Sequence, residues 1–148
     1  MPENQIYEAF GPHLVMDGYG CPAGRLEDLD LLYEFLDTMP EIMGMTKIIP
    51  PHVLKYRGKV PEDWGLSGFV IIAESHISVH TFPAKGYISI DAFSCKDFDV
   101  KKFEFITRKM FQMERADVQT LGRGLEFPRS VDVVSKFVTD ERQGISPG

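Results

Sequence analysis

The chain has 148 residues, a formal net charge of −6, 43% hydrophobic residues and 26% charged residues. A chain of this size and composition is typical of one globular domain with its own core, so we expect a single domain over residues 1–148. The negative charge disfavours nonspecific binding to nucleic acid, and no apolar run approaches the roughly 20 residues that span a membrane.

The first part of the chain predicts a strand, a helix and two further strands. Residues 13–16 are apolar and lead into a glycine-rich turn, which indicates a short strand. Apolar side chains at helical spacing predict an amphipathic helix over residues 26–38, which Pro40 should end. The next predicted elements are strands at residues 45–49 and 52–56 and a loop up to Gly65.

Residues 68–95 are the most informative stretch, because an apolar hairpin pattern there contains many reactive side chains. The first strand runs from Phe69 through Ala73 and onward, the turn lies at residues 82–86, and the second strand spans residues 87–95. Buried hairpins seldom contain so many titratable or nucleophilic groups without a chemical use. These groups are Glu74, Ser75, His76, Ser78, His80, Asp91 and Cys95.

The last part of the chain predicts a second helix, a strand and a tail. Asp97 or Asp99 is a candidate cap for the helix, whose apolar side chains recur at helical spacing. Residues 117–121 predict a final strand. Residues 129–148 are expected to be a loosely ordered tail in which residues 131–138 could form a short helix. The predicted buried stripe of the helix is Val100, Phe103, Ile106, Met110 and Met113.

Together these elements predict an α+β fold, a two-layer α/β sandwich with a mostly antiparallel sheet and two main helices on one face. The other face of the sheet needs a covering, and a second copy of the chain is the simplest candidate, so we expect a homodimer. The first residues lack the regions of a signal peptide, and Cys21 and Cys95 are too few for a disulfide framework. We therefore expect a cytoplasmic location.

The reactive hairpin also resembles a known family. Residues 74–81, the turn with Pro83 and Gly86, and the later Asp91 and Cys95 closely resemble the prokaryotic S-adenosylmethionine decarboxylase proenzymes. The resemblance covers roughly residues 12–128 and includes Ser67-Gly68 and the stretch 17–21. It implies a dimer with active sites at the subunit junction, a small amino-acid-type substrate, and a role in polyamine biosynthesis, where decarboxylated S-adenosylmethionine donates the aminopropyl group of spermidine.

The resemblance implies self-cleavage between Glu74 and Ser75, which converts Ser75 into a pyruvoyl cofactor. Glu74 supplies the attacked carbonyl, and Ser67 polarises that carbonyl or its tetrahedral intermediate. His80 acts as the acid and base of processing, since a histidine can accept and release a proton near neutral pH. The cofactor forms a Schiff base with the substrate, Cys95 donates a proton in turnover, and neither pyridoxal phosphate nor a metal is expected.

The expected pairing of the hairpin places these groups relative to one another. With the turn centred near Ala84, Ser75 lies opposite Phe93 and Ala73 lies opposite Cys95, so Ser75 and Cys95 are diagonal neighbours about 7–8 Å apart. Strand alternation puts His80 on the face opposite Ser75. We therefore predict a bulge or turn between residues 75 and 80 that redirects the side chains.

Other interpretations of these residues compete with this one. His76 and Ser78 suit packed, hydrogen-bonded roles, and a free cysteine such as Cys95 is commonly a small buried apolar residue. A metal pair of His76 and His80 is disfavoured because the two lie about 13 Å apart along a strand. A hydrolase dyad of Cys95 and His80 would need an oxyanion site and a third, orienting group that the sequence does not show.

The turn departs from the family at the substrate-binding position. Relatives acting on S-adenosylmethionine usually have a glutamate that grips the ribose hydroxyls where this chain has Ala84, a loss worth about 1.5–3 kcal/mol. Glu62 or Asp63 could substitute, and Phe82 is the candidate residue to stack on adenine. Arginine or ornithine is therefore an alternative substrate. A non-catalytic partner subunit is a second alternative, which the intact pair Glu74-Ser75 with His80 and Cys95 disfavours.

Overall fold

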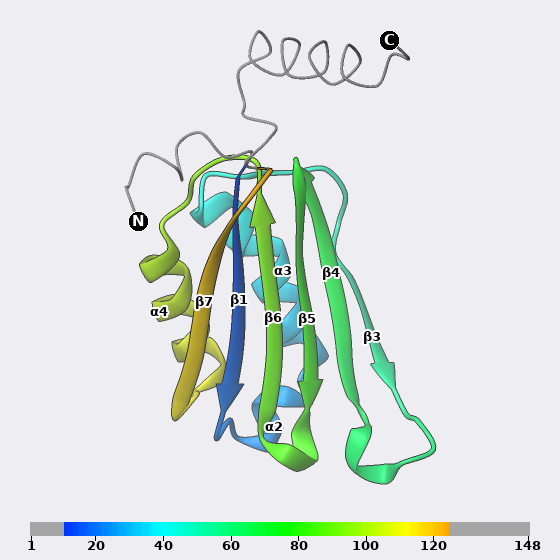
Figure 1. Cartoon of the computed structure of the whole chain (residues 1–148). Helices are drawn as coiled ribbons and strands as arrows, with labels where there is room; N and C mark the ends of the chain where they lie inside the picture. Colours follow the sequence, from blue (N-terminus) through cyan, green and yellow to red (C-terminus); the bar gives the residue numbers. More distant parts are fainter. Residues whose placement is uncertain (1–10, 125–148) are drawn as a thin grey trace, which may run out of the picture.

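The computed structural model describes residues 11–124, which form an antiparallel sheet with helices on one face (Figure 1). The strand order is β2-β4-β5-β6-β1-β7, and β3 pairs with β4 as well. The strands are β1 (Gly11–Tyr19), β2 (Thr46–Lys47), β3 (His52–Tyr56), β4 (Gly65–Ala73), β5 (Ser75–Phe82), β6 (Tyr87–Ser94) and β7 (Arg115–Arg123). The helices are α2 (Ala23–Leu26), α3 (Leu29–Ile42) and α4 (Val100–Phe111), and two short 3-10 helices are η1 (Pro61–Asp63) and η2 (Pro83–Lys85).

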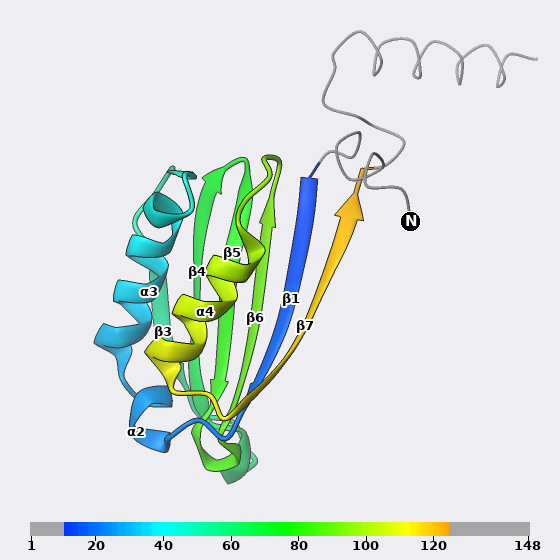
Figure 2. The same cartoon turned by 90° about the vertical axis from the view of Figure 1, so that its left-hand side faces the viewer.

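Turned by 90°, the structure separates into a helix layer and a strand layer (Figure 2). The two-layer α+β sandwich with two main helices, α3 and α4, is therefore confirmed. Aromatic side chains join the two main helices, since Phe35 of α3 packs edge-on against Phe103 and Phe111 of α4 and all three are fully buried. Burial of such large apolar side chains is the main contribution to the stability of this face.

Capping side chains set the helix starts. Asp28 accepts a hydrogen bond from the backbone N–H of Leu31, 3.0 Å away, so the predicted helix over 26–38 divides into the short α2 and the longer α3. Asp99 caps α4 in the same way, as predicted. The expectation that Pro40 ends the first helix was wrong, because Pro40 is buried within α3 and the helix continues to Ile42. A proline removes one upstream hydrogen bond, and it does not prevent the following residues from staying helical.

The central hairpin differs most from the prediction. The apolar run that begins in β4 does not continue past Ala73, because the chain reverses at Glu74 and β5 returns antiparallel to β4. The predicted turn at residues 82–86 is present, so the segment forms three strands in place of two. The predicted bulge or turn between residues 75 and 80 was wrong, since residues 75–80 pair in unbroken register with both neighbouring strands.

Strand alternation divides the side chains between the two faces of the sheet. On β5, Ile77, Val79 and Thr81 are buried under the helices, whereas His76 and His80 point to the other face, which we call the open face. The open face has large exposed apolar side chains: Leu54, Tyr56, Phe69 and Leu121 are 42% to 56% exposed. An apolar surface of this kind on a sheet is a candidate protein contact.

One prediction, the expected tail over residues 129–148 with its short helix, lies outside the described residues. Among residues 11–124, none of the helices has the length and apolar character needed to cross a bilayer.

Candidate functional site

Glu74, at the reversal between β4 and β5, lies against Cys95, which directly follows β6. The backbone N–H of Glu74 donates to the Cys95 sulfur at 3.3 Å, and the backbone N–H of Cys95 donates to the Glu74 carbonyl oxygen at 3.2 Å. The carbonyl proposed for self-attack is therefore already polarised by a hydrogen-bond donor, and the thiol lies beside the N–H of the same residue. This position agrees with a role of Cys95 next to residue 75.

The pairing register is shifted by one residue from the prediction. Ser75 pairs with Ser94, and it is His76 that lies opposite Phe93. Cys95 therefore points to the open face, and it contacts Glu74 in place of lying diagonal to Ser75. The turn accounts for the difference, because four residues connect the paired Phe82 and Tyr87, so the hairpin is centred between residues 84 and 85 in place of Ala84.

Ser75 itself has an uncommon backbone conformation, with φ at +120°. A residue with a Cβ atom seldom adopts such an angle, and sparsely populated backbone regions cost of order 1–3 kcal/mol. Backbone strain of this type is frequently found at reactive positions. Here it falls on the residue that follows the predicted scissile bond.

The predicted processing pair forms, but far from Ser75 in the same chain. Ser67 Oγ and His80 Nδ1 lie 2.9 Å apart on adjacent strands β4 and β5. His80 is five residues from Ser75 along a regular strand, which corresponds to about 17 Å. One chain therefore does not bring Ser67 and His80 to the bond between Glu74 and Ser75. The reversal at Glu74 and the turn after β5 lie at opposite ends of the sheet (Figure 1).

The Ser67–His80 pair opens into a cavity of about 460 Å³. Phe82 and Asp63 also line it, so a candidate stacking ring and a carboxylate share this space with the pair. The Asp63 carboxylate is 2.7 Å from the ammonium group of Lys85, and that group lies 5.9 Å from the Phe82 ring centre. The remaining lining residues are Tyr56, Gly65, Leu66 and Thr81.

A second polar cluster lies on the open face close to Ser75. His76 Nδ1 is 3.4 Å from Ser75 Oγ, and the His76 ring packs edge-on against His13 at 6.4 Å between ring centres. His13 Nε2 is 3.2 Å from a carboxylate oxygen of Asp91, whose other oxygen accepts a hydrogen bond from Ser78 at 3.5 Å. No role for His13 was predicted from the sequence. Its place on the predicted strand at residues 13–16 was the signal that the sequence offered.

Burial and charge keep His76 neutral. Burial is the main cause of its lowered pKa, the neighbouring His13 lowers it further, and Asp91 opposes the shift. A neutral imidazole can accept a proton.

The two cysteines differ in environment. Burial, together with the Glu114 carboxylate, raises the pKa of the Cys21 thiol to about 11, so this thiol is protonated at neutral pH. Cys95 is half-buried, and both cysteines are free. Among residues 11–124, there is no cluster of three or more histidine, cysteine or acidic side chains arranged to hold a metal ion.

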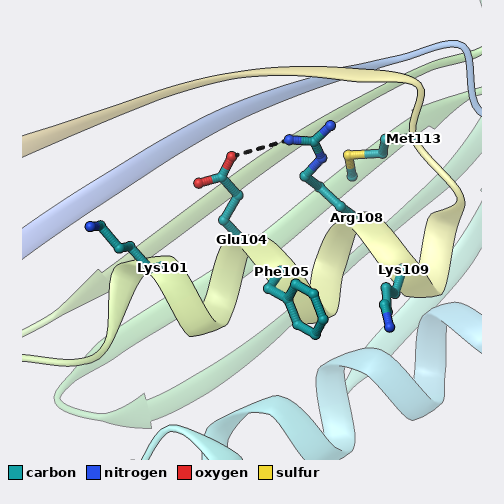
Figure 3. Close-up of a pocket in the computed structure, with 6 residues that line it drawn as sticks. All are labelled: Lys101, Glu104, Phe105, Arg108, Lys109 and Met113. Atoms are coloured by element: carbon teal, nitrogen blue, oxygen red, sulfur yellow. Dashed lines mark ion pairs between the residues drawn. The ribbon is translucent and has the colours of Figure 1, made fainter.

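The helix layer has a hollow of its own along α4, with a volume of about 570 Å³ (Figure 3). An ion pair between Glu104 and Arg108, 3.6 Å apart, crosses its wall, and Lys101, Phe105, Lys109 and Met113 complete the lining. None of the predicted site residues is among them, so this hollow is separate from the reactive end of the sheet.

Comparison with known proteins gives a consistent result. A sequence model of the S-adenosylmethionine decarboxylase family matches residues 12–124. An S-adenosylmethionine decarboxylase proenzyme of Clostridium botulinum is 36% identical over 115 residues, covering 77% of this chain and 94% of the relative. One from Pyrococcus abyssi is 32% identical over 121 residues, covering 80% of this chain and 82% of the relative.

A solved structure agrees with the sequence comparisons. The crystal structure of the adenosylmethionine decarboxylase of Aquifex aeolicus superposes with a TM-score of 0.65 and 28% identity, covering 79% of this chain and 92% of that one. The family match contains both main helices and all of the described sheet except Gly11. On fold, sequence match and length together, the chain belongs to the S-adenosylmethionine decarboxylase family.

Proposed function

We propose that the chain is a self-processing, pyruvoyl-dependent decarboxylase that acts on S-adenosylmethionine in polyamine biosynthesis. The observation that supports this most directly is the contact at the reversal, where the Cys95 thiol accepts from the Glu74 N–H and the Cys95 N–H donates to the Glu74 carbonyl. The names of the relatives support the substrate. A cytoplasmic location fits this role and stays a prediction.

Processing would begin with attack of the Ser75 hydroxyl on the Glu74 carbonyl, which exchanges an amide for an ester. Loss of the Ser75 α-proton then eliminates the ester and frees the Glu74 carboxylate. The dehydroalanine that remains hydrolyses to ammonia and a pyruvoyl group, leaving chains of residues 1–74 and 75–148. The Cys95 N–H fits this scheme, because a donor 3.2 Å from the carbonyl oxygen can stabilise the negative charge that develops there.

The pyruvoyl group supplies a carbonyl that binds the substrate amine and withdraws electrons as carbon dioxide leaves. Cys95 is proposed to donate the proton that replaces the lost carboxylate, since its sulfur lies beside residue 74 on the open face. This position next to residue 74 supports a thiol that donates to a carbon attached to residue 75.

A second copy of the chain is proposed to complete each active site. Ser67 and His80 contact each other but lie too far from Ser75 of their own chain to act on it, toward the other end of the sheet. Stacking two open faces in opposite directions would bring Ser67 and His80 of one copy toward the reversal of the other. It would also cover the exposed apolar side chains of that face, and a two-fold axis makes both contacts equivalent.

The cavity beside Ser67 and His80 is proposed to hold the substrate, with Phe82 stacking on adenine. The alanine at position 84 cannot accept a hydrogen bond from a ribose hydroxyl, whereas the carboxylate of Asp63 lines the cavity and can. If Asp63 has this role, Asp63→Asn should raise the KM for S-adenosylmethionine about tenfold with little change in kcat.

Two measurements test the proposed function. Intact mass of the purified chain should show two fragments, with the 75–148 fragment blocked at its N-terminus. Release of carbon dioxide, measured side by side, should be fastest with S-adenosylmethionine and slow with arginine and ornithine. A chain that stays whole and releases no carbon dioxide from any of the three would contradict the proposal and favour the non-catalytic partner subunit.

A further inference from the structure

We propose that His76 is the base that takes the hydroxyl proton of Ser75 when this hydroxyl attacks the Glu74 carbonyl. The inference rests on the proposed self-processing and assigns its first step to a residue of the same chain. His76 Nδ1 lies 3.4 Å from Ser75 Oγ, whereas His80 is separated from Ser75 by about 17 Å of strand. A catalytic hydrogen bond that is long at rest commonly shortens as the reaction begins.

The packing of the ring holds it at this position. The His76 ring meets Phe93 of β6 at 6.3 Å and His13 of β1 at 6.4 Å between centres, both in edge-on geometry. Contacts from two neighbouring strands limit the rotation of the side chain. The position of His76 Nδ1 beside Ser75 therefore does not depend on a second copy of the chain.

The charged groups that face His76 come from three strands: His13 from β1, Asp91 from β6 and Arg123 from β7. Burial and the neighbouring His13 lower the pKa of His76, Arg123 acts in the same direction, and Asp91 acts against them. The net result is a neutral ring at neutral pH, which is the form that can accept the proton of Ser75.

The step balances without any other reactant. The O–H bond of Ser75 breaks and its proton moves to Nδ1 of His76 as Oγ bonds to the Glu74 carbonyl carbon. The C–N bond between the two residues then breaks with its electron pair on the Ser75 nitrogen, which takes the proton back from His76. The product is an ester with a free amine, and the later removal of the α-proton remains with His80 of the second copy.

The experiment follows cleavage of freshly purified precursor by denaturing electrophoresis. His76→Ala should slow cleavage by about 100-fold or more, the usual range for loss of a general base, and added imidazole should restore part of the rate. The stalled precursor should resist hydroxylamine, because its linkage is still an amide. The matched control is His52→Ala, since His52 is an open-face histidine stacked on Phe69 at 5.3 Å, and its removal should leave the rate unchanged.

Cleavage of His76→Ala at the wild-type rate, or a stalled precursor that hydroxylamine cuts at Glu74, would overturn the inference. The second result would mean that the ester forms without His76. Failure of the wild-type chain to cleave would instead contradict the proposed function itself.

The pH dependence of the processing rate provides a second test of His76 as the base, and this test also applies if His76→Ala does not fold. Processing should slow as the pH falls through the pKa of His76, at a midpoint below its ordinary value of 6.5. Because Asp91 raises that pKa, Asp91→Asn should move the midpoint to lower pH. An unmoved midpoint would exclude His76 as the base.

Discussion

Complementation between two inactive variants tests whether an active site is shared between two copies of the chain. Ser75→Ala removes the attacking hydroxyl, and His80→Ala removes half of the Ser67–His80 pair. In the structure, about 17 Å of strand separates His80 from Ser75, against the roughly 3 Å that proton transfer requires. Each variant alone should therefore stay whole. A mixed dimer should contain one site with both residues intact.

The expected yield follows from the two-fold symmetry. With equal expression and random pairing, about half of the dimers are mixed and one of their two sites is complete, so about a quarter of all chains should be cut. Every cut chain should be of the His80→Ala type, which different tags on the two variants reveal on a denaturing gel. If co-expressed chains form mixed dimers and stay whole, the shared site is refuted. Cutting of His80→Ala expressed alone would refute the role of His80.

Three further predictions concern single residues. Cys95→Ala should still be cut but should release carbon dioxide about 100-fold more slowly, and blocked cleavage in this variant would contradict the assignment of Cys95 to turnover. Iodoacetamide at pH 8 should modify Cys95 and spare Cys21, because the Cys21 thiol has a pKa raised to about 11. Thr81→Val should lower the free energy of unfolding by about 2–4 kcal/mol in denaturant titrations, because the hydroxyl donates to the Leu26 carbonyl at 2.8 Å and accepts from the Leu66 N–H at 2.9 Å, and both groups would lose this partner inside the core. Its control, Thr107→Val, removes only a bond to a helical carbonyl and should cost less than about 1 kcal/mol, so equal losses would argue against this reason. Ala84→Glu should lower the KM for S-adenosylmethionine by about 10- to 100-fold, and an unchanged KM would show that the cavity does not bind the ribose through position 84.

The fold class could be predicted from the sequence because periodicity reports burial directly. The apolar spacing of α4 and its cap at Asp99 gave both the helix and its start. The reversal at Glu74 could not be predicted in the same way. It contains neither glycine nor proline, and its Ser75 has a φ of +120° that residues with a Cβ seldom adopt. The local sequence therefore does not predict the turn, which is held by contacts from the end of β6.

The arrangement of the candidate site residues was only partly predictable. Glu74 and Cys95 lie in contact, close to where the motif placed them. The placement of His80 depended on whether the chain turned before or after Ser75, and a straight strand required a bulge that the structure does not have. The proximity of His13 to His76 depends on pairing between β1 and β6, which are far apart in the chain. Such nonlocal pairing is set by the packing of the whole sheet.

The strand order has a consequence for a chain that is cut between Glu74 and Ser75 as proposed. Residues 1–74 provide β1 and β4, and residues 75–148 provide β5, β6 and β7, yet β1 lies between β6 and β7 and β4 pairs with β5. The two fragments are thus interleaved through one continuous sheet, and neither can leave without breaking ladders on several edges. Cleavage of the backbone therefore need not separate the two fragments. Once denaturant separates the fragments, however, regaining the native state becomes a bimolecular event whose rate depends on protein concentration.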